Sequence, residues 1–86
     1  VRNLALEYGP QGIRANAICP GVVKTEFARA LWDSEAGEER ARTQVPLRRF
    51  GQPEDFAGVA VFLASDASSY MTGQALTLCG GTNMWS

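Results

Sequence analysis

Residues 13–25 read IRANAICPGVVKT, and this stretch decides the fold. Its first part, Ile13 to Cys19, is short, mixes small with β-branched side chains and is flanked by Gly and Pro, which predicts a strand covered on both faces. Pro20-Gly21 then ends the strand, and residues 22–25 leave its carboxyl end as a loop. In open α/β sheets ligands bind outside the carboxyl ends of strands, and a glycine there lets backbone approach a ligand closely. Pro20, Gly21 and Thr25 are therefore candidate binding residues.

The same residues have a simpler interpretation. Pro-Gly is a common turn pair, and the hydroxyl of Thr25 is a common helix cap. The local motif alone favours this second interpretation, so a binding site here depends on the wider pattern.

The segment before the strand predicts a helix. Val1, Leu4, Ala5 and Tyr8 recur at helical spacing, and Gly9-Pro10 ends the helix, with Gly9 as its left-handed cap. Helix, tight turn and buried strand make half of a βαβ unit, whose sheet is parallel. Because the chain opens in mid-helix with Val1, we expect that residues upstream have been cut away and that the 86 residues are only marginally stable alone.

Two further segments follow the strand. Residues 26–45 predict a broken helix with a new cap at Asp33-Ser34, and their amphipathic, charged pattern is typical of a lid. Residues 53–64 predict a helix that is apolar nearly all round, so both of its sides need cover, one from the sheet and one from a second subunit. A capped turn at 65–69 and a strand at 75–79, closed by Gly80-Gly81, complete the order of elements.

Composition excludes several classes of protein. The net charge of −1 lacks the positive footprint of a nucleic-acid binder, and the apolar run 56–64 is far too short to span a membrane. With no histidine, the 86 residues hold no Ser-His-Asp triad, Cys-His dyad or histidine-ligated metal. The two cysteines, Cys19 and Cys79, form no CxxC motif, which favours reduced thiols in a cytoplasmic protein.

Three motifs in order carry a family resemblance. Residues 13–25, the stretch PLRRFGQPED at 46–55 and the stretch AVFLASDASSYMTGQ at 60–74 resemble the last third of the short-chain dehydrogenase/reductase (SDR) family, and Gly80-Gly81 closes the match. The resemblance implies one domain over 1–86: the carboxyl-terminal part of a Rossmann-type, doubly wound parallel sheet of α/β class. It also implies NAD or NADP as cofactor and hydride transfer between a small-molecule carbonyl and a secondary alcohol.

The resemblance assigns roles to particular residues. The cofactor-binding set is the loop after the strand: Val23 would offer backbone N–H and C=O groups to the nicotinamide amide, Thr25 would contact the amide or pyrophosphate, and Pro20, Gly21 and Val22 shape the approach. Residues 26–45 would be the substrate lid, in which Phe27, Leu31 and Trp32 either form a substrate wall or fasten the lid to the core. Helix 53–64 would join subunits of a homo-oligomer. Asn16 is expected to be a structural hydrogen-bonding residue, and Lys24 lies outside the family's catalytic motif.

Two departures from the family qualify this assignment. Neither Tyr8 nor Tyr70 is followed by Lys four residues later, so the Tyr-x-x-x-Lys acid/base pair does not occur in these 86 residues, which we predict to be inactive alone. The alternatives are a non-catalytic module that docks through helix 53–64 and a self-contained α/β protein that mimics the pattern. Cys79 stands where the family often has an acidic or polar residue. In the resembled fold it would end a strand parallel to the one ending at Cys19, which leaves a disulfide as a hypothesis.

Overall fold

Two short parallel strands form the centre of the computed structural model, which describes residues 1–82. The strands are β1 (Ala17–Pro20) and β2 (Ala75–Leu78), paired from Ala17 opposite Ala75 to Pro20 opposite Leu78. Both therefore end at the same edge of the sheet. The predicted α/β class, with neighbouring parallel strands, is confirmed.

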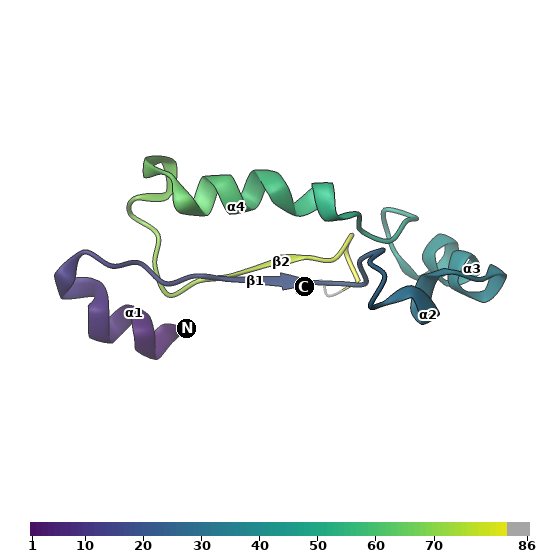
Figure 1. Ribbon diagram of the computed structural model, residues 1–86, viewed down its shortest axis with the longest axis horizontal. Coiled ribbons are helices and arrows are strands. Elements are labelled where there is room, and N and C mark those ends of the chain that lie inside the picture. The colour runs from purple at the N-terminus through teal and green to yellow at the C-terminus, as the bar shows by residue number, and fades with distance from the viewer. Residues whose placement is uncertain (83–86) are drawn as a thin grey trace.

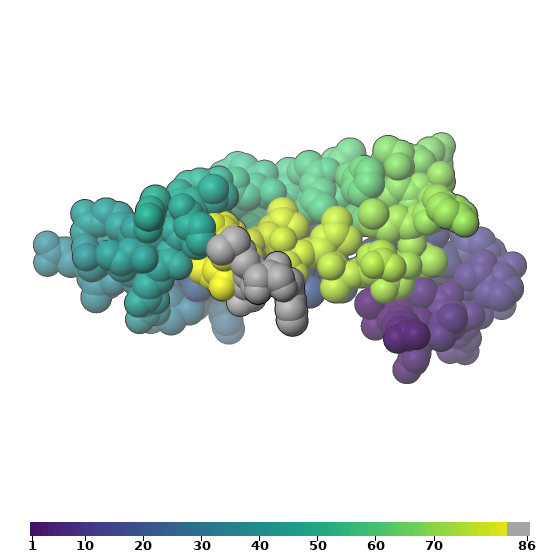
Figure 2. Space-filling model, turned by 180° about the vertical axis from the view of Figure 1, so that it is seen from behind, coloured from purple at the N-terminus to yellow at the C-terminus, as the bar shows by residue number. Residues whose placement is uncertain are grey.

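Helices lie on both sides of this strand pair. Figure 1 shows α1 (Arg2–Tyr8) on one side and α4 (Ala57–Ala64) on the other, with the short α2 (Arg29–Trp32) and α3 (Glu35–Gln44) beyond the carboxyl ends of the strands. Seen from behind, the α2–α3 segment and α1 occupy opposite ends of an elongated molecule (Figure 2). No helix among residues 1–82 is long and apolar enough to cross a membrane.

Local sequence signals explain where the downstream helices begin. The hydroxyl of Ser34 accepts a hydrogen bond of 3.0 Å from the N–H of Gly37 at the start of α3. A 3-10 turn, η2 (Pro53–Phe56), precedes α4, and Gln52 and Asp55 cap it reciprocally. The predicted break at Asp33-Ser34 is therefore confirmed, whereas the predicted single helix over 53–64 is a 3-10 turn followed by an α-helix.

The buried core is small and lies at the lid end of the molecule. Ala41, Val45 and Phe50 are its buried members, and Val22 and Trp32 pack against them while half-buried. The whole chain exposes 6452 Å², against roughly 5000 Å² for a compact protein of this mass. Much apolar surface thus remains open to solvent.

Several predicted boundaries are wrong. Gly9 is α-helical (φ −54°) and opens the 3-10 turn η1 (Gly9–Gln11), so the left-handed residue is Gly12 (φ 78°). β1 begins at Ala17 rather than Ile13, because side-chain hydrogen bonds to residues 71–74 replace part of the strand ladder there. β2 ends at Leu78 rather than Cys79. β1 is also not covered on both faces along its length: Cys19 and Pro20 are exposed, since the described elements do not enclose the sheet.

Candidate functional site

The candidate site is the elbow, residues Pro20–Thr25, where the chain leaves the carboxyl end of β1. Its second residue, Gly21, donates a hydrogen bond of 3.0 Å from its N–H to the carbonyl of Leu78. A Cβ atom added to Gly21 would lie 3.0 Å from the Cα atom of Cys79, so only glycine fits without a shift of the backbone. The elbow is thus pressed against the end of β2.

Gly51 fastens the middle of the elbow. Its N–H donates to the carbonyl of Val22 (2.9 Å), and its carbonyl accepts from the N–H of Lys24 (2.8 Å). These two bonds make an isolated parallel bridge between Val23 and Gly51. The elbow is therefore held by backbone from a segment 28 positions further along the chain (51 − 23).

Val23 keeps one backbone group open. Its carbonyl accepts a hydrogen bond of 2.8 Å from the N–H of Thr25, while its own N–H has no hydrogen-bond partner among residues 1–82. The residue is only half-buried. An N–H group in such a place is satisfied by water or by a ligand with an acceptor oxygen.

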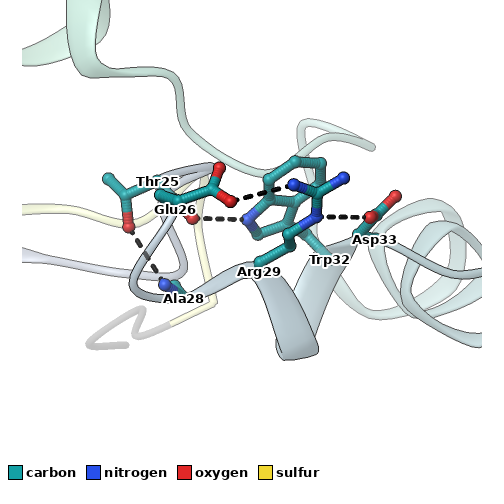
Figure 3. Close-up of polar contacts among 6 residues, drawn as sticks. All are labelled: Thr25, Glu26, Ala28, Arg29, Trp32 and Asp33. Carbon is teal, nitrogen blue, oxygen red and sulfur yellow. Dashed lines mark hydrogen bonds and ion pairs between the residues drawn. The ribbon is translucent and has the colours of Figure 1, made fainter.

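Thr25 holds the start of the lid (Figure 3). Its hydroxyl accepts a hydrogen bond of 3.2 Å from the N–H of Ala28, and its carbonyl accepts one of 3.0 Å from the indole N–H of Trp32. The Thr25 hydroxyl therefore closes the turn before α2, but the N-cap of α2 is Ala28, without a side-chain cap bond, so the helix cap expected in the simpler interpretation is wrong. The hydroxyl hydrogen remains available as a donor to a ligand.

The three candidate substrate residues do not gather around one cavity. Phe27 is fully exposed and Leu31 is exposed by 48%, whereas Trp32 packs on the core and bonds to Thr25. Trp32 also lies beside the cations Lys24 and Arg29, 5.7 and 6.0 Å from its ring. Of the two interpretations, Trp32 has the contacts of a residue that fastens the lid.

A cavity of about 960 Å³ adjoins the elbow. Gly21 and Val22 line it from the elbow, together with Val45 and Pro46 at the end of the lid and Leu78 at the end of β2. Val23, Thr25 and the three candidate substrate residues are not part of its lining. The elbow therefore borders this space by its first half only.

Two groups of ion pairs lie near the elbow at the surface. Arg49 contacts both carboxylate oxygens of Asp55 (2.7 and 3.0 Å), and this contact, with the N–H of Gln52, lowers the pKa of Asp55 to about 2. Arg29 bridges Glu26 and Asp33 (2.9 and 2.7 Å), and the hydrogen bond to Asp33 and then that to Glu26 raise its pKa (Figure 3). Among residues 1–82, no three His, Cys, Asp or Glu side chains are grouped to hold a metal ion.

Cys19 lies on β1, whereas Cys79 follows the last residue of the parallel strand β2, and no disulfide joins the two cysteines. Cys19 pairs with Thr77 in the register, so Cys79 is two positions further along its strand, past the end of the ladder. This offset separates the two side chains along the sheet.

Comparison with known proteins decides the family. A family model described as enoyl-(acyl carrier protein) reductase matches residues 1–83. The chain is a member of the short-chain dehydrogenase/reductase family. It is 45% identical over 80 residues to "Dehydrogenase/reductase SDR family member 4" of Oryctolagus cuniculus, an alignment that covers 93% of this chain and 31% of the relative. This SDR chain thus spans about a third of the length of the curated relatives it matches.

Solved structures show the same fold. A gluconate 5-dehydrogenase from Burkholderia cenocepacia, in complex with NADP and tartrate, superposes with a TM-score of 0.88 at 37% identity over 94% of this chain and 32% of its own. A 4-hydroxyisoleucine dehydrogenase complexed with NADH gives a TM-score of 0.90 at 29% identity over 99% of this chain and 35% of its own. The SDR chain is therefore part of a Rossmann-type fold, in a family whose members bind NADP or NADH.

Sequence reasoning missed two residues that shape the SDR elbow and its strand. Gly51 has no role of its own in the interpretation of the sequence, although it anchors Val22 and Lys24. Arg14 received no role, although its guanidinium makes five hydrogen bonds to residues 63–71. The motif PLRRFG marks the first as a structured loop, but neither long-range partner is encoded in a local pattern.

Proposed function

We propose that the protein is an NAD(P)-dependent oxidoreductase that interconverts a carbonyl and a secondary alcohol, and that this SDR chain contributes the elbow beside the nicotinamide. The observation that supports it most is the half-buried elbow at the carboxyl edge of the sheet, with the N–H of Val23 unpartnered among residues 1–82. This edge is where open α/β sheets bind ligands.

The groups of the elbow fit a flat amide. The open N–H of Val23 suits the carbonyl oxygen of a carboxamide, and the carbonyl of Val23 has a second lone pair for an amide N–H. The missing side chain of Gly21 lets the elbow lie close to the end of β2. When bound, the nicotinamide supplies or accepts the hydride, and the elbow orients its ring by hydrogen bonds to neutral backbone groups.

The lid would cover the substrate. Phe27 and Leu31, which are exposed on the lid, are the proposed apolar wall, while Trp32 holds the lid to the core and to the carbonyl of Thr25. The pairing of Arg29 with Glu26 and Asp33 stiffens the same turn. In this proposal the lid moves as a unit about the elbow.

The elbow is tested by removing the Val23 N–H in the gene product at its full encoded length. Val23→Pro removes the donor without breaking a hydrogen bond between residues 1–82, and Val23→Ala is the matched control. We expect Val23→Pro to weaken NADH or NADPH binding about tenfold, the value of one hydrogen bond, and Val23→Ala to bind normally. Equal binding by both variants in a fluorescence titration of the reduced cofactor contradicts the proposed role.

The isolated 86 residues are proposed to be inactive, because they contain no Tyr-x-x-x-Lys pair to move the proton. The test is hydride transfer by the purified 86-residue chain, followed by the absorbance of reduced nicotinamide. Turnover at the rate of a complete family member would contradict this.

The cytoplasmic location predicted from the cysteines stays a prediction that cell fractionation can test.

The segment 53–64, which is η2 followed by α4, supports a proposal about assembly. Val61 is exposed by 67% and Phe62 by 36%, while Val59 and Leu63 on the other face are half-buried. We propose that the exposed face packs on a second copy of the protein; the alternative is a docking module without chemistry. Val61→Asp should dissociate the assembly in size-exclusion chromatography with light scattering, with Glu54→Gln as control. An unchanged mass would contradict the interface.

A further inference from the structure

A second, smaller cavity lies under the lid, and we call it the lid pocket. Its volume is about 220 Å³, which corresponds to roughly seven water molecules. It opens between Lys24 of the elbow, Trp32 of α2, the inner face of α3 and the loop that follows α3. Of the elbow residues, Lys24 alone lines the lid pocket.

The lining of the lid pocket is rich in cations. Lys24, Arg42, Arg48 and Arg49 all contribute to it, against one carboxylate, that of Glu38. Arg42 is paired with Glu39, and Arg49 with Asp55. Lys24 and Arg48 have no ion-pair partner within residues 1–82, so the lining carries a net positive charge after Glu38 is counted.

Arg48 is held at the pocket by an uncommon backbone conformation. It has a φ angle of 63°, and within residues 1–82 no other residue except glycine has a positive φ. Its N–H donates to the carbonyl of Val45 (2.7 Å), and its guanidinium donates to the carbonyl of Arg42 (2.9 Å). That bond uses one of the five N–H donors of the guanidinium, which leaves others for a ligand. A non-glycine residue in this conformation costs energy, and such residues cluster at functional sites.

The remaining walls are apolar. Ala41 and Phe50 are buried core residues, and Trp32 presents its indole ring next to the ammonium group of Lys24 (5.7 Å to the ring centroid). A small molecule that fits this space would combine an anionic group with a short carbon skeleton. Carboxylates and phosphates are the oxyanions that Lys and Arg bind best.

We propose that the lid pocket binds an oxyanion, a carboxylate or phosphate group, through Lys24 and Arg48, with Trp32 and Phe50 against the adjoining carbon atoms. Lys24 lies between Val23 and Thr25 in the elbow, and it is the elbow residue that joins the lid pocket to this segment. The inference that this anion belongs to the substrate, which would make it a small hydroxy or oxo acid, rests on the proposed function; anion binding itself does not.

The test uses isothermal titration calorimetry of the gene product at its full encoded length, at constant ionic strength. Succinate and inorganic phosphate are the probes, and butane-1,4-diol is the neutral counterpart of succinate. We expect either or both anions to bind and the diol not to bind. Lys24→Met and Arg48→Asn should each weaken anion binding about tenfold, since each removes a charge-assisted hydrogen bond. Asn is chosen at position 48 because it tolerates a positive φ.

Three control variants separate a site from general electrostatics. Arg2→Gln removes a positive charge from exposed α1 and should leave anion affinity unchanged, and Lys24→Arg should retain most of it. Glu38→Gln should strengthen anion binding about threefold, the effect of one repelling surface charge, while Glu35→Gln outside the lining should not. Binding that is absent, equal for the diol, or weakened as much by Arg2→Gln overturns the proposal.

Adding cofactor distinguishes the two sources of the anion. If the pocket takes the substrate's carboxylate, succinate will bind equally well to protein saturated with NADH or NADPH. If it takes a phosphate of the cofactor, NADPH or NADH will displace inorganic phosphate competitively. Both outcomes support the site. Because the first titrations need no cofactor, a failure of the proposed oxidoreductase function would be seen separately, as absent cofactor binding.

Discussion

The two ends of β1 are held in different ways. At the amino end, side chains add to two backbone hydrogen bonds, from the N–H of Gly73 to the carbonyl of Ala15 (2.7 Å) and from the N–H of Ala17 to the carbonyl of Gln74 (2.8 Å). Arg14 donates five further hydrogen bonds to residues 63–71, and Asn16 accepts from the N–H of Gln74 and donates to the carbonyl of Met71. At the carboxyl end, the backbone of Gly51 and Leu78 makes the ties, and the N–H of Val23 is left without a partner among residues 1–82.

This difference suggests that the amino end of β1 serves stability and the carboxyl end serves ligand binding. The acceptors around Arg14 include the carbonyls of Leu63 and Ser65, at the carboxyl end of α4, where a cation also interacts favourably with the helix dipole. These carbonyl groups are therefore already hydrogen-bonded within the protein and are not available to a ligand. At the carboxyl end, backbone hydrogen bonds from Gly51 and Leu78 fix the elbow, while the N–H of Val23 has no partner among residues 1–82. A ligand-binding site at the edge of a sheet needs such an available donor.

Loss of Arg14 should have the largest effect on stability. Arg14→Met leaves several acceptor groups without their donor, and we expect the free energy of unfolding to fall by about 3 kcal/mol. Urea denaturation of the gene product at its full encoded length measures this, with Arg2→Met on exposed α1 as the matched control. Arg14→Lys should recover only part of the loss, because a compact ammonium group cannot reach all of the acceptors that the guanidinium contacts between residues 63 and 71. A loss similar to that of the control would remove the contrast between the two ends.

Gly21→Ala should affect both stability and binding. The new Cβ atom would lie 3.0 and 3.1 Å from the Cα and Cβ atoms of Cys79, so the elbow must shift from β2. We expect a loss of about 2 kcal/mol, typical of overpacking, and weaker binding of NADH or NADPH. Gly9→Ala is the control, since a Cβ there meets nothing within 4 Å and its φ is −54°. If Gly21→Ala lowers stability yet binds cofactor normally, the elbow does not touch the cofactor.

Local signals in the sequence predicted much of this arrangement. The Ser34 cap, the parallel neighbours and the structural role of Asn16 all follow from short patterns: a cap residue before a helix, two short strands in an α/β order, and an amide inside a strand. Each depends on residues close in sequence or on a rule of topology. The family resemblance adds which strands these are.

What could not be predicted depends on distant partners. The pairing of Gly51 with the elbow and of Arg14 with residues 63–71 joins segments far apart in sequence, and nothing local distinguishes Arg14 from an ordinary exposed arginine. The left-handed residue is Gly12 and not Gly9, because Pro10 does not stop the chain from turning: proline also suits the first turn of a 3-10 helix. Lys24 and Arg48 are likewise distant in sequence, and they line the same pocket only because the fold brings them together.

Ser34→Ala tests how independent the lid is from the elbow. It removes the cap of α3, and we expect a loss of about 1 kcal/mol in stability. Hydrogen exchange should show the increase in opening over residues 35–44 and not over 14–17, because the cap belongs to the carboxyl end alone. Ser34→Thr, which keeps the hydroxyl, is the matched control. Faster exchange at both ends would mean that the two regions unfold as one.

The smallest effect should come from Asp55, whose carboxylate pairs with Arg49 next to Gly51. The Arg49 hydrogen bonds and then the Gln52 N–H lower the pKa of Asp55 from 3.8 to about 2 in the folded protein, so the unfolded chain binds this proton more readily. The ion pair therefore stabilises the fold above pH 3.8, and that contribution is lost as the pH falls toward 2. Asp55→Asn should be less stable than the parent at pH 6 and approach it near pH 2 in urea denaturation. The control is Glu54→Gln, which changes a neighbouring carboxylate without an ion pair in residues 1–82. A constant gap between Asp55→Asn and the parent would mean that the Asp55 side chain acts by shape and hydrogen bonding, and that its charge contributes nothing to holding the carboxyl end of β1.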